Sequence, residues 1–470
     1  MALQLPAEFE NYMTSRLGTA YPDFLKSLEE PPCVGIRYNP KKSAAFPGEQ
    51  VPWSQYGRYL RERPVFTLDP TFHAGAYYVQ EASSMFLEQA VRHSVDLSKP
   101  LTVLDLCAAP GGKSTHVLSL LSPDSLLISN ETIRSRASIL SENIQKWGHD
   151  NVIVTSNDPS DFRRLTGFFD LIIADVPCSG EGLFRKEPEA IKGWSSKNVE
   201  HCSLRQRRIV SDVWPSLKPG GVLIYSTCTY NEKENIENLT WLESQHEAEF
   251  IQLSPMKDWG IETIEKGPCI GYQLYPHRLK GEGFFLAAIR KKEGRLPSLQ
   301  PKNSLKFPSA NQIKEFSNWI SSPEAQCFFL HHQTVRMIPG GLKCDLQLAL
   351  NNLNVVTAGT AVLEIMKNKF VPDHALALSI KIRKENFETL SLTREQALDY
   401  LRKNNLSVAT ARIGFARIEF EGFGLGWVNV LQNRINNLYP ASWRIRMGHE
   451  GPIQPTTSQK KIIVASGTSE

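Results

Sequence analysis

Short apolar runs, most of them rich in Val and Ile, alternate with longer segments of helical spacing through the middle of the chain. Runs of core-strand length occur at 101–106, 125–131, 151–155, 170–176 and 221–227. The segments between them repeat their apolar residues with the period of a helix. Strand and helix in alternation predict a mostly parallel sheet covered by helices on both faces, an α/β architecture.

The pattern outside this region predicts further units on both sides. The stretch 292–309 is basic, interrupted by prolines and poor in apolar residues, as linkers are. The last unit combines a helical segment with β-like runs. The predicted units are an N-terminal mixed α/β, RNA-binding extension (1–90), a catalytic domain (91–291), the linker (292–309), a middle domain (310–379), an α+β RNA-binding unit (380–450) and a flexible tail (451–470).

Composition narrows the class of protein. The 470 residues are 41% hydrophobic and 22% charged, which excludes a wholly disordered chain. The net charge of +4 permits an anionic partner. No apolar run approaches the roughly 18 residues of a membrane helix, and the start resembles no secretory signal. None of the 8 cysteines forms a close pair with metal-ligand spacing, so no metal site is predicted, and a reducing cytoplasm is expected.

The most informative segment for ligand binding is the turn after the first predicted strand, LDLCAAPGGKS at 104–114. A buried strand ends there and a helix begins, so N–H groups of the helix start are free to bind a ligand. Small residues let a ligand approach the backbone closely. Ligands of open α/β sheets bind outside the carboxyl ends of the strands, so this turn is a predicted binding site.

Three ligand classes compete for this turn. GKS at 112–114 matches the end of a phosphate-binding P-loop, but Cys107 replaces its first glycine and Pro110 lacks an N–H donor. The G-x-G-x-x-G pattern of dinucleotide-binding turns is absent. A nucleoside such as S-adenosylmethionine needs a close-packed turn and an acid for the ribose hydroxyls. Glu131, after the second strand, suits the ribose, and Asp158, after the third, suits the adenine amino group.

Two cysteines follow strands four and five of the predicted sheet. Cys178 lies in ADVPCSG and Cys228 in YSTCTY. Carbon 5 of cytosine is too weakly nucleophilic to take a methyl group unaided, and a thiolate that adds to carbon 6 activates it. An acid near N3 then stabilises the developing negative charge, a contact that suits Asp175. The residues alone leave open which cysteine is the nucleophile.

Three motifs in this order, LDLCAAPGGKS, ADVPCSGEGLFRK and YSTCTYNEKEN, resemble those of the Sun-family RNA (cytosine-5) methyltransferases. The segments at 73–85 and 275–289 are similar to those that flank the family's core, so the resemblance covers residues 1–290. It implies a seven-stranded, Rossmann-like methyltransferase sheet, S-adenosylmethionine as the methyl donor, and RNA as the substrate.

The resemblance also implies roles for site residues. Cys228 is then the nucleophile, Cys178 helps to break the covalent adduct, Asp175 contacts the base and Lys113 lines the site. The Cys107 thiol itself is expected to be a packing group. The residues expected to line the donor are Cys107, Ala108, Ala109, Pro110, Gly111, Gly112, Lys113, Glu131, Arg136, Asp158 and Asp175.

Basic and aromatic residues indicate where RNA binds. The segment 426–446 interleaves aromatic residues with arginines and asparagines, and resembles the C-terminal PUA-like unit of bacterial F-type small-subunit rRNA methyltransferases. Trp427 and Tyr439 are expected in the core of that unit, and its arginines on RNA. A second basic group, expected to hold phosphates near the Pro-Cys loop, consists of Arg185, Lys186, Arg205, Arg207 and Arg208.

The sequence therefore predicts a cytoplasmic, monomeric enzyme that methylates carbon 5 of a cytosine in 16S rRNA, within the small ribosomal subunit. The alternatives are a tRNA cytosine-5 methyltransferase, a P-loop-like nucleotide-binding protein, and a non-catalytic RNA-binding assembly factor.

Overall fold

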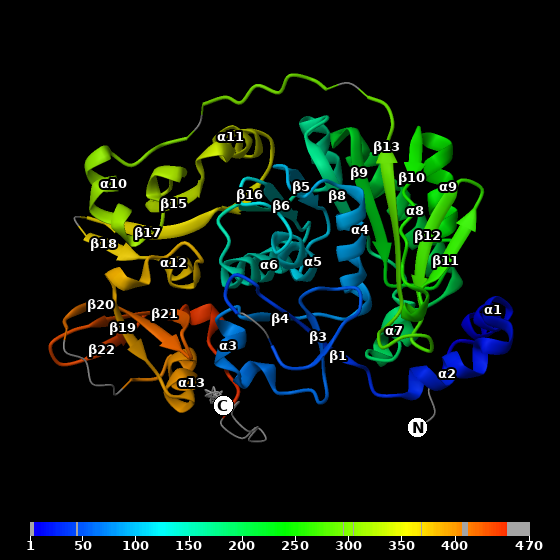
Figure 1. Cartoon of the computed structure of the whole chain (residues 1–470), viewed down its shortest axis with the longest axis horizontal. Helices are drawn as coiled ribbons and strands as arrows, with labels where there is room; N and C mark the ends of the chain where they lie inside the picture. Colours follow the sequence, from blue (N-terminus) through cyan, green and yellow to red (C-terminus); the bar gives the residue numbers. More distant parts are fainter. Residues whose placement is uncertain are drawn as a thin grey trace, which may run out of the picture.

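The computed structural model of the chain describes residues 4–43, 46–294, 296–303, 305–367, 369–406 and 412–448. Within these residues the chain forms one large sheet and three four-stranded sheets, arranged as in Figure 1. The predicted tail at 451–470 lies outside the described residues. No helix in the described part of the chain is long and apolar enough to cross a membrane.

The five strands predicted from the apolar runs lie side by side in the centre of the large sheet. Neighbouring strands in the order β7, β6, β5, β8 and β9 run parallel to one another. The strands are β5 (Thr102–Asp105), β6 (Leu126–Asn130), β7 (Val152–Thr155), β8 (Phe169–Asp175) and β9 (Leu217–Thr227). The predicted α/β architecture is confirmed, and the carboxyl ends of these strands form one edge.

Antiparallel strands extend the sheet on both sides. Next to β9 lies β13 (Phe284–Lys291), which pairs with both β12 (Cys269–Leu274) and β10 (Ala248–Phe250), and β11 (Glu262–Lys266) follows β12. On the other side, β16 (Val355–Ala358) pairs with β7. The parallel core together with β13 and β12 makes the seven strands of a Rossmann-like methyltransferase sheet, and this fold class is confirmed.

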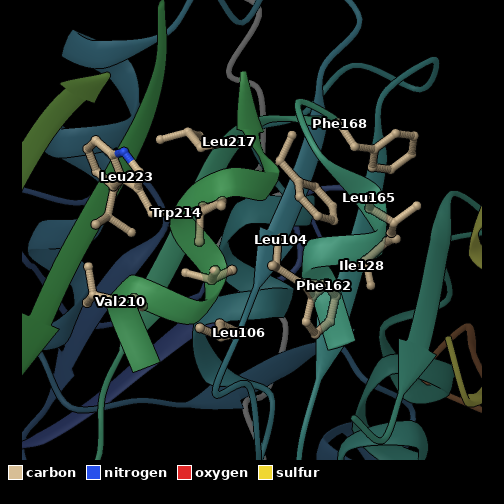
Figure 2. Close-up of a cluster of buried hydrophobic side chains, with 14 of the residues drawn as sticks. Leu104, Leu106, Ile128, Phe162, Leu165, Phe168, Val210, Trp214, Leu217 and Leu223 are labelled. Atoms are coloured by element: carbon tan, nitrogen blue, oxygen red, sulfur yellow. The ribbon is translucent and has the colours of Figure 1, made fainter. Parts of the chain in front are cut away.

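Helices cover both faces of this sheet because successive strand residues point to opposite sides. Val103 packs in a cluster with α4, α5 and α6, whereas Leu104 packs with Phe162, Val210 and Trp214 in the cluster of Figure 2. The helices of this region are α4 (Leu87–Ser94), α5 (Gly112–Leu118), α6 (Arg134–Trp147), α7 (Pro188–Gly193), α8 (Ser196–Val213) and α9 (Ile236–Gln245).

The N-terminal extension is mixed α/β. Two helices, α1 (Ala7–Leu17) and α2 (Tyr21–Glu29), precede a sheet in the order β2-β3-β1-β4, and the short helix α3 (Pro70–His73) precedes its last strand. The strands of this sheet are β1 (Val34–Tyr38), β2 (Glu49–Gln50), β3 (Gly57–Leu60) and β4 (Tyr77–Val79).

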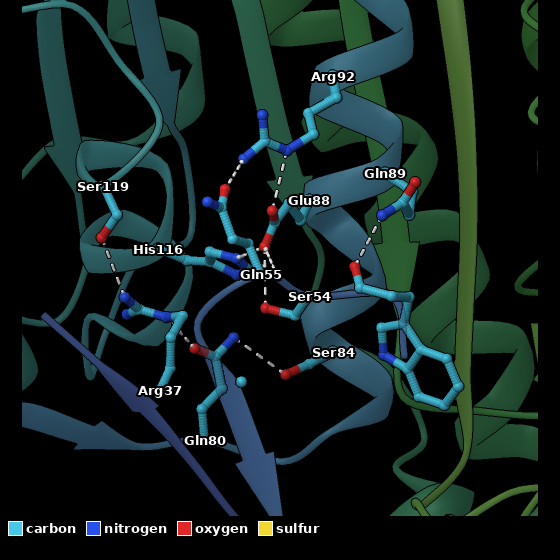
Figure 3. Close-up of polar contacts among 12 residues, drawn as sticks. Arg37, Ser54, Gln55, Gln80, Ser84, Glu88, Gln89, Arg92, His116 and Ser119 are labelled. Atoms are coloured by element: carbon cyan, nitrogen blue, oxygen red, sulfur yellow. Dashed lines mark hydrogen bonds and ion pairs between the residues drawn. The ribbon is translucent and has the colours of Figure 1, made fainter. Parts of the chain in front are cut away.

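A buried arginine fastens this extension to the helix that follows the glycine-rich turn. Arg37, on β1, is fully buried and donates to the side chains of Gln80, Thr115 and Ser119 at 3.0, 2.6 and 3.2 Å, two of which are visible in Figure 3. Its guanidinium also lies 4.6 Å from the ring centroid of Trp147. Burial lowers the pKa of Arg37 to about 9, so the side chain is charged at neutral pH.

A buried glutamate lies beside this arginine in Figure 3. Glu88 accepts hydrogen bonds from Arg92, Ser54 and His116 at 2.9, 2.9 and 3.1 Å. Burial lowers the pKa of His116 to about 4. Burial would raise the pKa of Glu88, but its three partners lower it to about 2. A neutral imidazole therefore donates to an ionised carboxylate at this contact between the extension and the catalytic domain.

Two smaller sheets complete the chain. Trp427 and Tyr439 are buried, as predicted, and the Trp427 indole N–H donates to the carbonyl of Asp373 at 2.8 Å, which joins the last sheet to the region before it. The first region consists of α10 (Ala310–Phe316), β14 (Gln326–His331), β15 (Thr334–Pro339), α11 (Lys343–Asn352), β16, β17 (Thr360–Met366), β18 (Lys369–Pro372) and α12 (His374–Leu378). The last consists of β19 (Glu388–Ser391), α13 (Arg394–Arg402), β20 (Gly414–Phe420), β21 (Phe423–Val430) and β22 (Ile435–Asn437).

Candidate active site

The glycine-rich turn joins β5 to α5 at the carboxyl edge of the sheet. Gly111 has φ +117°, in the region that favours glycine, and precedes the first residue of the helix. The Ser114 hydroxyl donates to Asp105 Oδ2 at 2.6 Å and so closes the turn from inside. Burial raises the pKa of Asp105 to about 7. A Cβ at Gly112 would lie 3.3 Å from the Tyr78 ring, so the turn is closely packed.

The predicted ribose-binding acid lies next to this turn. Glu131 directly follows β6, is 5% exposed, and accepts the N–H of Ile133 at 2.9 Å. Its carboxylate pairs with Arg136 at 3.3 Å, and Arg136 also donates to the carbonyl of Ala109 in the turn at 2.9 Å. The structure therefore brings Glu131, Arg136 and the turn together, as the sequence predicted.

The predicted adenine-binding acid lies at the end of the next strand along. Asp158 follows β7 and accepts the N–H and hydroxyl of Ser160 at 3.1 and 2.8 Å. Arg208 pairs with it at 3.4 Å. Burial would raise the pKa of Asp158, but the Ser160 and Arg208 contacts lower it, so this exposed side chain is an ionised acceptor.

The two predicted cysteines meet at the same edge. Asp175 and Ser226 are paired in the parallel register of β8 and β9, and Cys178 and Cys228 follow shortly after. Their sulfur atoms are 3.1 Å apart. The hydrogen bond with Cys228, together with burial, raises the pKa of Cys178 well above its ordinary value. Cys178 therefore keeps its proton and is the natural S–H donor of the pair, which leaves Cys228 as the acceptor.

An ion pair lies beside the cysteines. Lys113 Nζ is 2.7 Å from Asp175 Oδ2, and the Ser226 hydroxyl donates to Asp175 Oδ1 at 2.8 Å. Burial would lower the pKa of Lys113, but Asp175 more than offsets this effect and raises it. The ammonium group therefore stays charged and also lies 5.2 Å from the Phe284 ring centroid. These contacts hold an acid, a cation and two thiols at one strand edge.

Two buried glutamates that the sequence analysis did not single out connect the cysteine loops. Glu181 follows Cys178 in the chain, and its carboxylate accepts the N–H of Tyr230 in the Cys228 loop at 3.0 Å. Glu234 follows Cys228, and its carboxylate accepts the N–H of Ser179 in the Cys178 loop at 3.0 Å. Each loop thus supplies a carboxylate to the backbone of the other, and both side chains are fully buried.

These glutamates could have been noticed from the sequence, since each lies within six residues of a cysteine in a motif. Their burial could not have been read there, because acidic residues next to polar ones are usually exposed. Burial raises the pKa of Glu181, and it raises that of Glu234 to about 7.

Part of the predicted phosphate-binding group has other partners. The Arg185 side chain is 5% exposed, pairs with Glu282 at 2.8 Å and donates to the carbonyl of Gly281 at 2.8 Å, so its prediction as a phosphate ligand is wrong. Arg207 donates to Asn238 Oδ1 at 2.8 Å. The members of the group that are exposed are Lys186, Arg205 and Arg208. The exposed arginines of the last unit are Arg434, Arg444 and Arg446.

The groups at this edge fit a ligand with a ribose and an amino group. Glu131 offers a carboxylate beside a turn of small residues, where ribose hydroxyls could be bound. Asp105 Oδ1 is buried without a hydrogen-bond partner among the described residues. A buried acceptor of this kind is consistent with a nearby ligand that carries N–H donors. The fit supports S-adenosylmethionine.

Three family models match the chain. The N-terminal domain of 16S rRNA methyltransferase RsmF matches residues 5–82, 16S rRNA methyltransferase RsmB/F matches 94–290, and the methyltransferase RsmF PUA domain matches 387–445. The three matches follow one another in the order of the predicted N-terminal, catalytic and RNA-binding units.

Curated relatives share the name ribosomal RNA small subunit methyltransferase F. The protein of Pectobacterium atrosepticum is 35% identical over 63% of this chain, and the chain spans 64% of its length, just under two thirds. The protein of Escherichia coli O6:H1 is 27% identical over 90% of this chain and 92% of its own. That of Aliivibrio fischeri is 29% identical over 92% and 95%.

Solved structures share the fold. A methyltransferase homolog from Pyrococcus horikoshii is 26% identical, with a TM-score of 0.50 over 61% of this chain and 100% of its own. NSun6 from Pyrococcus horikoshii, solved with SFG, is 21% identical, with a TM-score of 0.53 over 63% and 100%. From the motif-bearing strand edge and the three matched domains, the chain belongs to the RsmB/F family of 16S rRNA methyltransferases, in the form that carries the RsmF N-terminal and PUA domains.

Proposed function

We propose that this chain methylates carbon 5 of a cytosine in 16S rRNA, with S-adenosylmethionine as the donor and Cys228 as the nucleophile. The observation that carries the proposal is the 3.1 Å separation of the Cys178 and Cys228 sulfurs beside the Lys113–Asp175 pair. Two thiols, an acid and a cation at one edge suit attack on a pyrimidine ring.

The reaction begins with the Cys228 thiolate. Because Cys178 retains its proton, its S–H stabilises the Cys228 thiolate before attack. The sulfur of Cys228 bonds to carbon 6 of a cytosine that has left its base stack, and electron density moves to carbon 5 and N3. Asp175 contacts N3, and the neighbouring Lys113 ammonium stabilises the negative charge there.

Release of the product involves the second cysteine. S-adenosylmethionine supplies the methyl group when it is bound, and carbon 5 forms the new bond. Loss of the carbon-5 proton then restores the 5,6 double bond and expels the Cys228 thiolate. Cys178, next to that sulfur, acts in this release step. Donor binding falls to the turn from Cys107 to Lys113 together with Glu131, Arg136, Asp158 and Asp175.

The remaining units bind RNA in this proposal. The extension at 1–90 and the unit at 380–450, with its exposed arginines, flank the catalytic domain at 91–291, and 292–309 links it to the middle domain at 310–379. The substrate is rRNA within the small ribosomal subunit, and the enzyme acts in the cytoplasm as a monomer.

Methyl transfer from labelled donor to 16S rRNA, as free RNA and as assembled subunits, tests the proposal. Cys228→Ala should reduce turnover by at least about 10³-fold while donor affinity is unchanged, because the nucleophile is lost and the donor site is not. Cys344→Ala, which removes an exposed thiol on α11, is the matched control and should retain activity. Substantial turnover by Cys228→Ala, or methylation of tRNA in place of 16S rRNA, would count against the proposal.

A further inference from the structure

The region between the catalytic and PUA-domain matches, residues 291–386, completes the catalytic sheet. Its strand β16 lies antiparallel to β7, with Ala358 opposite Ile153 and Val355 opposite Thr155. β7 would otherwise be an edge strand with unpaired backbone groups. Residues about 200 positions apart therefore form one sheet, visible in the centre of Figure 1.

The helix before β16 is anchored in the core of the catalytic domain. Leu346, Ala349 and Leu353 are buried in the same cluster as Ile153 and Phe162. Burying apolar side chains of this size is worth about 1.5–3 kcal/mol each. The start of β16 is therefore held rigidly against β7.

Between that helix and β16, Asn354 contacts the loop that carries Asp158. The Asn354 N–H donates to Asn157 Oδ1 at 2.9 Å. The Ser156 N–H donates to the Asn354 carbonyl at 3.0 Å, and Asn354 Nδ2 donates to the Ser156 carbonyl at 3.3 Å. Three hydrogen bonds thus attach the residues directly before Asp158 to the middle region.

A second asparagine holds the same loop from its inner side. Asn130, fully buried at the end of β6, donates from Nδ2 to the carbonyls of Leu106 and Asn157 at 3.1 and 3.0 Å. Its Oδ1 accepts the N–H of Asn157 at 2.9 Å. One side chain therefore joins the ends of β5, β6 and β7, which precede Cys107, Glu131 and Asp158. Asn354 closes this row on the outside.

We propose that the middle region is part of the donor site, and that Asn354 and Asn157 are positioning residues that hold Asp158 in place for the adenosine moiety. The inference rests on the proposed function, since it takes S-adenosylmethionine as the ligand of this edge. The middle region then supports donor binding as well as linking the catalytic domain to the last sheet.

The test is the affinity of the full chain for S-adenosylmethionine, measured by calorimetry, together with steady-state methylation. Asn157→Ala removes the acceptor of the Asn354 N–H, and Asn354→Pro removes the donor. Each should weaken donor affinity about five- to tenfold, the effect of about one hydrogen bond, and raise the KM for the donor while kcat is nearly unchanged. The double variant should be little worse than either single variant, because both remove the same bond.

Two matched controls separate positioning from general destabilisation. Asn354→Ala keeps the backbone N–H, and Asp161→Ala breaks only the other side-chain bond of Asn157, from Nδ2 to Asp161 at 2.9 Å. Both should bind the donor within about twofold of the parent. Parent-like donor affinity in Asn157→Ala and Asn354→Pro, or additive losses in the double variant, would overturn the inference. If the parent itself bound no S-adenosylmethionine, the proposed function would fail instead.

Discussion

Replacing Glu234 by glutamine tests whether a desolvated carboxyl braces the two cysteine loops. The Glu234 carboxyl is fully buried, and burial raises its pKa from 4.5 to about 7 although Ser179 and Gln206 donate hydrogen bonds to it at 3.0 and 2.8 Å. Glutamine has the same length and keeps an oxygen for the Ser179 N–H, but it cannot ionise.

The size of the effect follows from this pKa. Between pH 4.5 and pH 7 the folded protein holds a proton that the unfolded chain has released, so this group's contribution to stability falls as pH rises through that window. Above pH 7, ionising Glu234 in the folded protein costs about 3 kcal/mol relative to the unfolded chain. Glu234→Gln avoids this cost, so its free energy of unfolding relative to the parent should rise by about 2–3 kcal/mol between pH 5 and pH 8.

Urea unfolding followed by tryptophan fluorescence at pH 5, 6, 7 and 8 measures this difference. Glu243→Gln, at an exposed position of α9, is the matched control and should show no comparable trend. A difference between Glu234→Gln and the parent that is flat with pH would refute the reasoning, because it would mean that the carboxyl is not desolvated. Glu234→Ala, which also removes the acceptor for Ser179, should lower turnover more than Glu234→Gln does.

Three further predictions concern other parts of the chain. Arg37→Met should lower the free energy of unfolding by about 3–5 kcal/mol in urea, because the fully buried guanidinium makes several hydrogen bonds that methionine cannot replace. Lys113→Met should slow single-turnover methyl transfer by about 10²–10⁴-fold, because the positive charge beside Asp175 is lost. Gly426→Ala should lower the melting temperature and weaken rRNA binding, because φ is +146° there and an added Cβ would collide with the Tyr400 hydroxyl and the His374 ring. Parent-like behaviour of any of these variants in its assay would contradict the corresponding contact.

The central sheet could be predicted because its strands carry local signals. Each of the five parallel strands is a short apolar run bounded by turn residues, so hydrophobic periodicity alone indicated its place in a buried sheet. The turn and the two cysteines could be brought together for a related reason, since residues after parallel strands meet at one edge. Trp427 and Tyr439 were correctly predicted as core residues, as large aromatic side chains in β-like runs usually are.

Contacts between distant segments could not be predicted in the same way. The run that becomes β16 has four residues, and its partner β7 lies about 200 positions earlier, so nothing local indicates the pairing. Arg37, Arg185 and Glu234 are buried because other segments supply their hydrogen-bond partners. The sequence pattern around a charged residue favours exposure, and only the tertiary partners reverse that expectation.

The most direct test of the central claim is to locate the covalent bond between protein and RNA. Cys178→Ala should be incubated with S-adenosylmethionine and 16S rRNA, denatured, digested and analysed by mass spectrometry. The account predicts an adduct that survives denaturation, with a cytosine nucleotide attached to the peptide that contains Cys228. Attachment at any other residue, or normal turnover by Cys178→Ala with no trapped species, would contradict it.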